Sequence, residues 1–303
     1  MEKIVITGGK PLSGNIVIGG SKNAILPIMA TCILTDEPLH LTNVPNLRDI
    51  QTMSKVLESL GVKVDNSQIE QNKLTICYKE IDKSIAEYDL VRKMRASVLI
   101  LGPLLARKKE ASVSLPGGCA IGARPIDIHI DALERLGASF TLDGGYVNCS
   151  APNGLRGNRI DLKKISVGAS ENIIMAACLA KGETEINNIA IEPEVIDLIK
   201  CLKSMGSEIE FIDDRKILIQ GKDTLKGTAH NVISDRIETG TYMIAGALIG
   251  KNLNIQNIEK EHIKNILSVF RELKIDFKLD GNCISLSKSD VDLGINLKTE
   301  EYP

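Results

Sequence analysis

The sequence predicts an α/β protein made of repeated βαβαββ units that pack around buried helices. Four apolar segments rich in alanine and methionine recur at intervals of about 72 residues, and a fixed period of this size indicates structural repeats. These segments are apolar on every side, as helices buried inside a domain are. Each is followed by a short strand, an amphipathic helix and a pair of strands. The four segments span residues 24–34, 96–106, 169–180 and 240–249.

The buried helices contain two prolines that predict different outcomes. Pro27 lies in the first turn of its helix, where a missing N–H group is tolerated. Pro103 lies in the middle of its segment and predicts a kink or an early end. The short strands that follow the four helices are expected at residues 39–44, 111–115, 183–189 and 253–258.

An amphipathic helix comes next in each unit, because apolar residues recur there at helical spacing. Three of these helices end at a glycine, Gly61, Gly137 or Gly206, which is the preferred C-cap residue. Alternating strands then predict a hairpin, as in residues 139–149. One unit cannot bury its own apolar helix, so several must assemble. A further strand is expected at residues 15–18, 158–162, 229–233 and 295–297.

The composition excludes several classes of function. The net charge is −2 and aromatic residues make up 3%, so neither a nucleic-acid surface nor an anionic-membrane surface is expected. The chain has neither a signal peptide pattern nor an apolar run of about 18 residues, so we expect no membrane span and a cytoplasmic location. The seven cysteines form no CxxC pair and the four histidines show no ligand spacing. We therefore expect neither a metal site nor a disulfide framework.

The chemistry is expected in the glycine-rich stretch that follows the strand at 111–115. Residues 116–125 hold a proline and three glycines before Arg124, which predicts a loop. Cys119 beside glycines can be approached closely, and Arg124 can bind a phosphate or a carboxylate in bidentate fashion. From spacing alone, a glycine-rich turn with a chance buried cysteine is the simpler interpretation.

A resemblance favours the functional interpretation. The string PGGCAIGARPIDIHI at residues 116–130 is similar to the active-site loop of the UDP-N-acetylglucosamine enolpyruvyl transferases, the 1-carboxyvinyltransferases of peptidoglycan synthesis in the EPSP synthase-like superfamily. The resemblance covers the whole chain. Further matching motifs are Ser21-Lys22-Asn23-Ala24, Met94-Arg95-Ala96-Ser97, Ser166-Val167-Gly168-Ala169, Glu192-Pro193-Glu194 and Asp235-Arg236-Ile237-Glu238-Thr239-Gly240.

The resemblance implies an inside-out α/β barrel fold with two domains of three units each and a ligand cleft between them. Residues 22–230 would form one complete three-unit domain with the cysteine loop. Residues 1–21 and 231–303 would form a discontinuous second domain that lacks about two of its three units. The family pattern continues beyond residue 303 towards an aspartate general base and further arginines. We therefore expect weak or no turnover from these 303 residues and an exposed apolar surface on the incomplete domain.

The resemblance also implies a reaction. The enolpyruvyl group of phosphoenolpyruvate would move to the 3-hydroxyl of UDP-N-acetylglucosamine with release of phosphate, and neither a metal nor an organic cofactor would be needed. Cys119 would be the general acid, and fosfomycin, a covalent inhibitor of the family, would label it. Lys22 and Asn23 would lie at the phosphoenolpyruvate site, with Asn23 on its sugar side and Arg124 on its phosphate.

The nucleotide sugar would be bound by residues from three segments. The implied set is Arg95, Arg124, Pro125, Ile126, Asp127, Ile128, Lys164, Ile165, Ser166 and Val167, with Gly168 completing a diphosphate cradle and with Glu192, Glu194, Asp235 and Arg236 as orienting residues. Simpler roles stay open for several of them. Asn23 or Ser166 could cap a helix, Asp127 could be an ordinary acidic residue of a first turn, and the last four could form solvated ion pairs. A catalytically impaired family member that at most binds UDP-N-acetylglucosamine is the alternative function.

Overall fold

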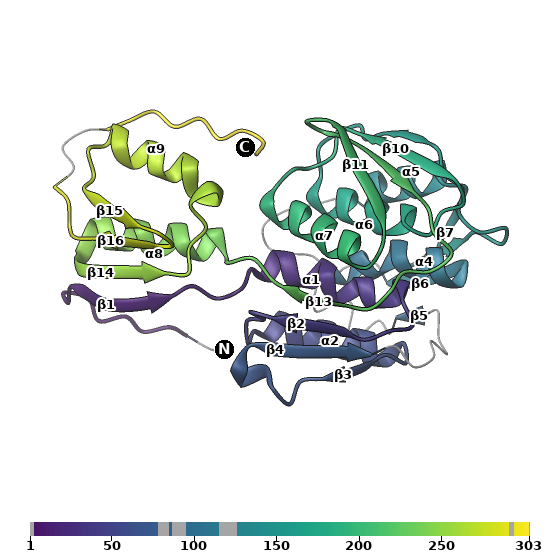
Figure 1. The fold of residues 1–303 in the computed structure, drawn as a ribbon, viewed down its shortest axis with the longest axis horizontal. Helices are drawn as coiled ribbons and strands as arrows, with labels where there is room; N and C mark the ends of the chain where they lie inside the picture. The colour runs from purple at the N-terminus through teal and green to yellow at the C-terminus, as the bar shows by residue number, and fades with distance from the viewer. Residues whose placement is uncertain (1–2, 78–84, 87–94, 115–125, 291–293, 303) are drawn as a thin grey trace. The chain divides into compact units, whose positions relative to one another are not determined.

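The computed structural model describes residues 3–77, 85–86, 95–114, 126–290 and 294–302 (Figure 1). The chain divides into two compact units. The larger unit comprises residues 20–233 and 301–303, and the smaller unit comprises residues 1–19 and 234–300. The domain bounds expected from the sequence, 22–230 for one domain and 1–21 with 231–303 for the other, stay a prediction.

The larger unit contains three repeats and a closing strand. The first repeat has α1 (Lys22–Ala30), the 3₁₀ helix η1 (Thr31–Leu34), β2 (Leu39–Thr42), α2 (Arg48–Ser59), β3 (Lys63–Asp65), η2 (Ile69–Gln71) and β4 (Lys73–Cys77). The second has β5 (Ile85–Ala86), η3 (Arg95–Ile100), α4 (Leu101–Lys108), β6 (Glu110–Ser114), α5 (Asp127–Arg135), β7 (Ser139–Asp143) and β8 (Tyr146–Ser150). The third has β9 (Arg159–Asp161), α6 (Val167–Ala177), β10 (Glu183–Asn187), α7 (Pro193–Ser204), β11 (Glu208–Asp213) and β12 (Lys216–Gln220), and β13 (Thr228–Asn231) follows.

The smaller unit contains one repeat and the first strand of the chain. Its elements are β1 (Leu12–Val17), α8 (Arg236–Ile249), β14 (Gly250–Gln256), η4 (Lys260–Ile263), α9 (Lys264–Glu272), β15 (Phe277–Asp280) and β16 (Cys283–Leu286). Its core is separate from that of the larger unit and is formed by apolar residues of α8, α9 and the sheet.

Each repeat folds into a four-stranded sheet with the same strand order. In the first sheet the order is β13-β2-β4-β3, with β13 parallel to β2 and the hairpin strands antiparallel. The other three sheets follow as β5-β6-β8-β7, β11-β12-β10-β9 and β1-β14-β16-β15. The α/β class and the fourfold repeat predicted from the sequence period are confirmed. Two edge strands come from distant sequence, because β13 joins the first repeat and β1 joins the fourth.

The apolar helices of the larger unit are buried, as predicted. Every residue of α1 from Ala24 to Ala30 and every residue of α6 from Ala169 to Ala177 is buried. The helices α1, α4 and α6, together with η3, pack against one another in one apolar core. Each of these helices is buried by helices of the other repeats, because one repeat alone cannot bury its own apolar helix.

Helix α8 differs from the other three. It was predicted to be buried all round, but only one face packs on the sheet of the smaller unit, through Met243, Gly246 and Ala247. On its other face Ile244 is 53% exposed and Leu248 is 61% exposed. The reason is that, among the described residues of this unit, α8 has no second apolar helix against which to pack. The apolar surface that was expected to be exposed in this part of the chain is therefore present on α8.

Two details of the predicted elements were wrong. The early end expected at Pro103 does not occur, because the segment changes from 3₁₀ to α-helix before the proline, which occupies the first turn of α4, and the helix continues to Lys108. Residues 295–297 form no strand, because no strand among the described residues pairs with them. The edge strand β5, at 85–86, is only two residues long and was not predicted.

Candidate active site

Lys22 is the first residue of helix α1, which begins two residues before the expected start at Ala24. The hydroxyl of Ser21 caps the helix by accepting a hydrogen bond from the backbone N–H of Ala24, at 3.4 Å. Asn23 is exposed and is not the cap. The Lys22 ammonium lies 3.3 Å from a carboxylate oxygen of Asp49 on α2, and both side chains are about 40% exposed. A cation beside a capped helix N-terminus is a suitable place for an anion.

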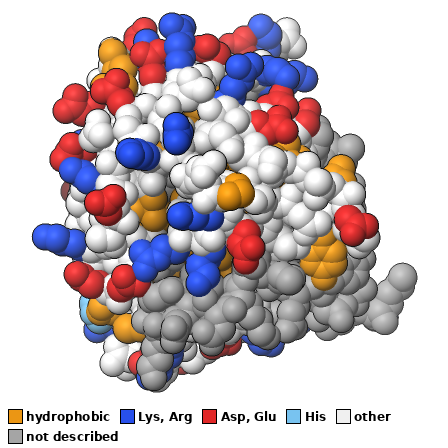
Figure 2. Space-filling view, turned by 90° about the vertical axis from the view of Figure 1, so that its right-hand side faces the viewer, with side chains coloured by type: hydrophobic (Ala, Val, Ile, Leu, Met, Phe, Trp, Pro, Cys, Tyr) orange, Lys and Arg blue, Asp and Glu red, His pale blue; other side chains and the backbone are white. Residues whose placement is uncertain are grey.

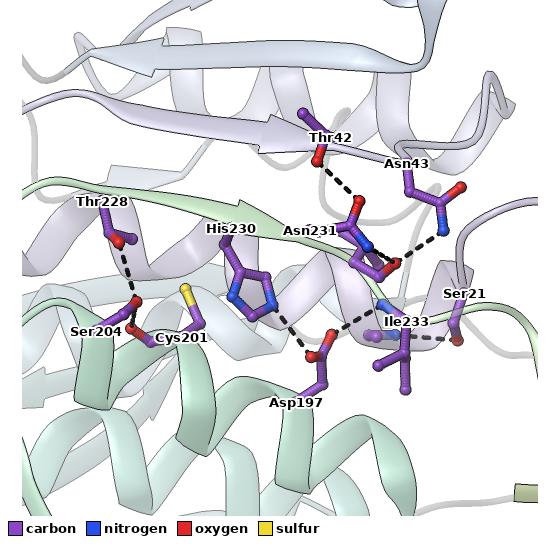
Figure 3. A network of polar contacts seen from close by, with 12 residues as sticks. Ser21, Thr42, Asn43, Asp197, Cys201, Ser204, Thr228, His230, Asn231 and Ile233 are labelled. Carbon is purple, nitrogen blue, oxygen red and sulfur yellow. Dashed lines mark hydrogen bonds and ion pairs between the residues drawn. The ribbon is translucent and has the colours of Figure 1, made fainter. Parts of the chain in front are cut away.

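The start of α1 is held by the segment that follows β13 (Figure 3). The backbone N–H of Ser21 donates to the carbonyl of Ile233 at 2.7 Å. The Asn43 side chain donates to the carbonyl of Val232 at 2.8 Å. Because these contacts join residues about 200 positions apart, the position of Lys22 depends on the closing strand of the unit.

A buried aspartate of α7 holds the same segment from the other side (Figure 3). One carboxylate oxygen of Asp197 lies 3.1 Å from His230 Nε2, and the other accepts from the backbone N–H of Ile233 at 3.3 Å. Asp197 is 2% exposed. These contacts were not predicted, since a histidine in a strand and an acid in a helix give no sign of pairing in sequence.

The starts of α5 and α6 lie side by side. Asp127 is the first residue of α5 and is exposed, and Ser166 caps α6 by accepting from the backbone N–H of Ala169 at 3.4 Å. The two helices pack against each other. The structure thus brings together residues Ile126, Asp127 and Ile128 of one predicted segment and Lys164, Ile165, Ser166, Val167 and Gly168 of the other.

A cavity of about 270 Å³ adjoins this place, between α5 and β9. Ile128 lines one side and Lys163 the other. Lys163 pairs with the Asp131 carboxylate, and hydrogen bonding and charge from Asp131 raise the pKa of Lys163.

Charged side chains of both signs are interspersed over the face of the larger unit drawn in Figure 2.

Three glutamates meet between α6 and the start of α7. Glu171 and Glu194 are each 3% exposed, so a solvated ion pair does not describe Glu194. Burial, and then the charges of Glu194 and Glu192, raise the pKa of Glu171 well above its usual range. Glu171 Oε1 and Glu192 Oε2 are buried without a hydrogen-bond partner. Glu171 was missed, and its signal was an acidic residue near the start of a helical segment that is mostly apolar.

The remaining predicted residues fall into two groups. Asp235 and Arg236 belong to the smaller unit, where the Asp235 carboxylate caps α8 by accepting from the N–H groups of Ile237 and Glu238, at 2.8 and 3.0 Å. Cys119, Arg124 and Pro125 lie outside the described residues. Arg95 begins η3, and its side chain is likewise outside the description.

The buried cysteines of the described chain are poor nucleophiles. Burial raises the pKa of Cys149, Cys178 and Cys201 to about 12 and raises that of Cys32 further. At neutral pH these thiols are protonated, and a protonated thiol is unreactive.

Among the described residues, no group of three histidine, cysteine or acidic side chains has the arrangement of a metal site. In the same part of the chain, every helix is too short or too polar to span a membrane.

Comparison with solved structures identifies the fold. The chain is similar to the enolpyruvyl transferase NikO from Streptomyces tendae, with a TM-score of 0.83 at 21% identity over 93% of this chain and 67% of that one. It is also similar to EPSP synthase from Acinetobacter baumannii, with a TM-score of 0.72 at 18% identity over 93% of this chain and 66% of that one. Residues 6–296 match the family described as EPSP synthase (3-phosphoshikimate 1-carboxyvinyltransferase). The fold is that of the EPSP synthase class.

Sequence relatives identify the family. The chain is 48% identical to the UDP-N-acetylglucosamine 1-carboxyvinyltransferase of Rhodospirillum centenum and 46% identical to that of Dinoroseobacter shibae. Each match covers all of this chain and 72% of the relative. The chain belongs to the UDP-N-acetylglucosamine 1-carboxyvinyltransferase family of transferases, and the resemblance noted in its sequence motifs is confirmed.

Proposed function

We propose that this protein transfers the enolpyruvyl group of phosphoenolpyruvate to the 3-hydroxyl of UDP-N-acetylglucosamine with release of phosphate, in the first committed step of peptidoglycan synthesis. The observation that carries this proposal is the 46–48% identity to transferases of that name along the whole chain. We expect the activity to be cytoplasmic and sensitive to fosfomycin.

The proposed roles follow from charge and position. Addition of the sugar hydroxyl to phosphoenolpyruvate needs a proton at the methylene carbon, for which Cys119 is the proposed donor. The hydroxyl loses its proton as its oxygen adds to the neighbouring carbon, and departure of phosphate from that carbon, together with loss of a proton from the methyl group, then restores the double bond. Lys22, at the capped start of α1, and Arg124 would neutralise the phosphate and carboxylate charges.

The nucleotide sugar has a proposed place at the paired starts of α5 and α6. The first turn of α6 presents backbone N–H groups that have no acceptor within the helix, and the Ser166 hydroxyl and Lys164 flank them. Asp127, at the start of α5, would accept from the uracil edge, with Ile126 and Ile128 packing the ring. Arg95 would contact the nucleotide sugar as well.

Phosphate release with both substrates tests the reaction, and calorimetry with UDP-N-acetylglucosamine tests binding. We expect Lys164→Met to weaken nucleotide-sugar binding and Lys22→Met to reduce phosphate release, whereas Lys181→Met, an exposed control, should change neither. Mass mapping after fosfomycin treatment should find the adduct on Cys119. Binding without turnover would support the alternative of an impaired family member, and absence of binding would refute the proposed nucleotide-sugar site.

A further inference from the structure

We propose that Asn172 is a positioning residue, whose side-chain amide holds the three segments of the proposed nucleotide-sugar site in fixed positions relative to one another. The segments are η3, which begins at Arg95, the start of α5 and the start of α6. The ligand in this inference rests on the proposed function, whereas the contacts that Asn172 makes do not.

The Asn172 side chain bonds to two backbone groups of another helical segment. Asn172 lies on α6 and is fully buried. Its amide oxygen accepts from the backbone N–H of Gly102 at 2.6 Å, and its amide nitrogen donates to the carbonyl of Val98 at 2.8 Å. Backbone N–H groups only donate and carbonyls only accept, so exchanging the amide oxygen and nitrogen would break both bonds.

The two backbone groups belong to the junction between η3 and α4. In a continuous α-helix the N–H of Gly102 would donate to the carbonyl of Val98, four residues earlier. The helix is not continuous there, because η3 ends at Ile100 and α4 begins at Leu101. The first N–H groups of α4 have no acceptor within the helix, and Asn172 supplies one. Since a side chain that inserts into a helix changes its direction, Asn172 sets the course of η3 relative to α6.

The residues at the junction are suited to this insertion. A Cβ atom on Gly102 would lie 2.3 Å from the side-chain oxygen of Asn172 and 2.4 Å from its carbonyl oxygen, so only glycine allows the approach. Pro103 follows and has no backbone N–H. The Gly-Pro pair therefore removes a side chain and a backbone donor at the point where the amide enters.

The same amide also reaches α5. Its second N–H proton faces Nδ1 of His129, at 3.1 Å. His129 follows Asp127 and Ile128, which are proposed to contact the uracil ring. Both α5 and the η3–α4 segment pack on α6. One buried side chain of α6 thus bonds to each of the other two segments, and displacement of either segment would break a bond of the amide.

The bond to Gly102 is measurable in the unmodified chain. Scalar coupling across a hydrogen bond correlates the donor ¹⁵N with the acceptor carbonyl ¹³C, which are here the backbone nitrogen of Gly102 and the side-chain carbon of Asn172. We expect this correlation in the labelled wild type. Its absence from a spectrum that shows the backbone correlations of α6 would overturn the proposal, whether or not the chain binds a nucleotide.

The role in binding is tested by two variants of Asn172. Asn172→Leu fills the same space without hydrogen bonds. Asn172→Ala leaves room in which a water molecule can bridge Gly102 and Val98 without fixing them to α6. We expect both variants to bind UDP-N-acetylglucosamine about tenfold more weakly than the wild type in calorimetry, which corresponds to about one lost hydrogen bond to the ligand.

Ser170→Ala is the matched control. Ser170 is also fully buried on α6, and its hydroxyl accepts from the backbone N–H of Ala190 at 2.9 Å. Ala190 belongs to none of the three segments, so binding by this variant should stay within about twofold of the wild type even where its urea midpoint falls as far as that of Asn172→Ala.

Wild-type binding by Asn172→Leu, or by Asn172→Ala where the leucine variant does not fold, would refute the positioning role. An equal loss of binding in Ser170→Ala would refute it as well, because lost stability would then explain the effect. Failure of the wild type to bind the nucleotide sugar would instead refute the proposed function, and the coupling measurement would still decide whether Asn172 holds the junction.

Discussion

The buried carboxyl of Glu171 predicts an unusual dependence of stability on pH. Glu171 is 3% exposed, one of its oxygens has no partner, and burial together with Glu194 and Glu192 raises its pKa well above the usual range. From about pH 4.3 upward, the unfolded chain releases this proton while the folded chain keeps it. The folded state therefore binds more protons, and its stability falls as the pH rises through the raised pKa.

The size of the expected pH dependence follows from the one proton that Glu171 keeps in the folded chain and loses in the unfolded chain. The difference in the free energy of unfolding between the wild type and Glu171→Gln should change by up to about 1.4 kcal/mol for each pH unit, in favour of the variant as the pH rises. Urea unfolding followed by circular dichroism from pH 5 to pH 8 measures this difference. Urea is preferred because it adds no ions that would screen the cluster.

A glutamate with the opposite environment provides the control. Hydrogen bonds from Lys216 and Asn187 lower the pKa of Glu185, so this group is ionised in both states over the same pH range. Glu185→Gln should displace the stability curve without changing its slope. A constant difference between the wild type and Glu171→Gln across the range would show that the buried carboxyl is ionised in the folded chain, and would refute the reasoning.

Three further changes should destabilise the fold by known mechanisms. Gly102→Ala would place a Cβ atom 2.3 Å from the Asn172 side-chain oxygen and 2.4 Å from its carbonyl oxygen, so we expect a loss of about 2 kcal/mol or more in thermal unfolding, whereas Gly8→Ala meets nothing within 4 Å and should be neutral. Asp235→Ala removes the cap of α8 and should cost about 1 kcal/mol, most of which Asp235→Asn should recover; equal losses would exclude capping. Asp197→Ala leaves two donors unpaired and should cost about 1–3 kcal/mol in urea unfolding; an unchanged midpoint would show that water replaces the carboxylate.

The fold was largely readable from the sequence because its main signals are local and repeated. The apolarity of the buried helices, the C-cap glycines and the alternation within the hairpins each depend on a few neighbouring residues, and the same signals recur about every 72 residues. The pairing of an edge strand depends instead on residues far away in the sequence. For this reason residues 295–297 were wrongly expected to form a strand, and the two-residue strand β5 was missed. The burial of α8 was overestimated because apolarity predicts a preference for burial but supplies no partner.

In the candidate site, only the residues that belong to sequence motifs could be predicted. Capping of α6 by Ser166 was among the predicted roles and is found. The start of α1 was predicted within two residues, but its cap is Ser21 and not Asn23. The buried polar groups behind these helix starts were not predicted. Asn172 and His129 are 43 positions apart, and their contact exists only because α5 packs on α6. Long-range contacts of this kind leave no pattern in one sequence.

The pairing of β1 with β14 has a consequence for biosynthesis. Leu12 is among the first residues to leave the ribosome, yet its partner Gly250 follows roughly 240 residues later. At ordinary rates of translation this delay is on the order of 10 to 50 s, during which β1 has no strand to pair with. The smaller unit should therefore acquire its structure only after the chain of the larger one has been synthesised.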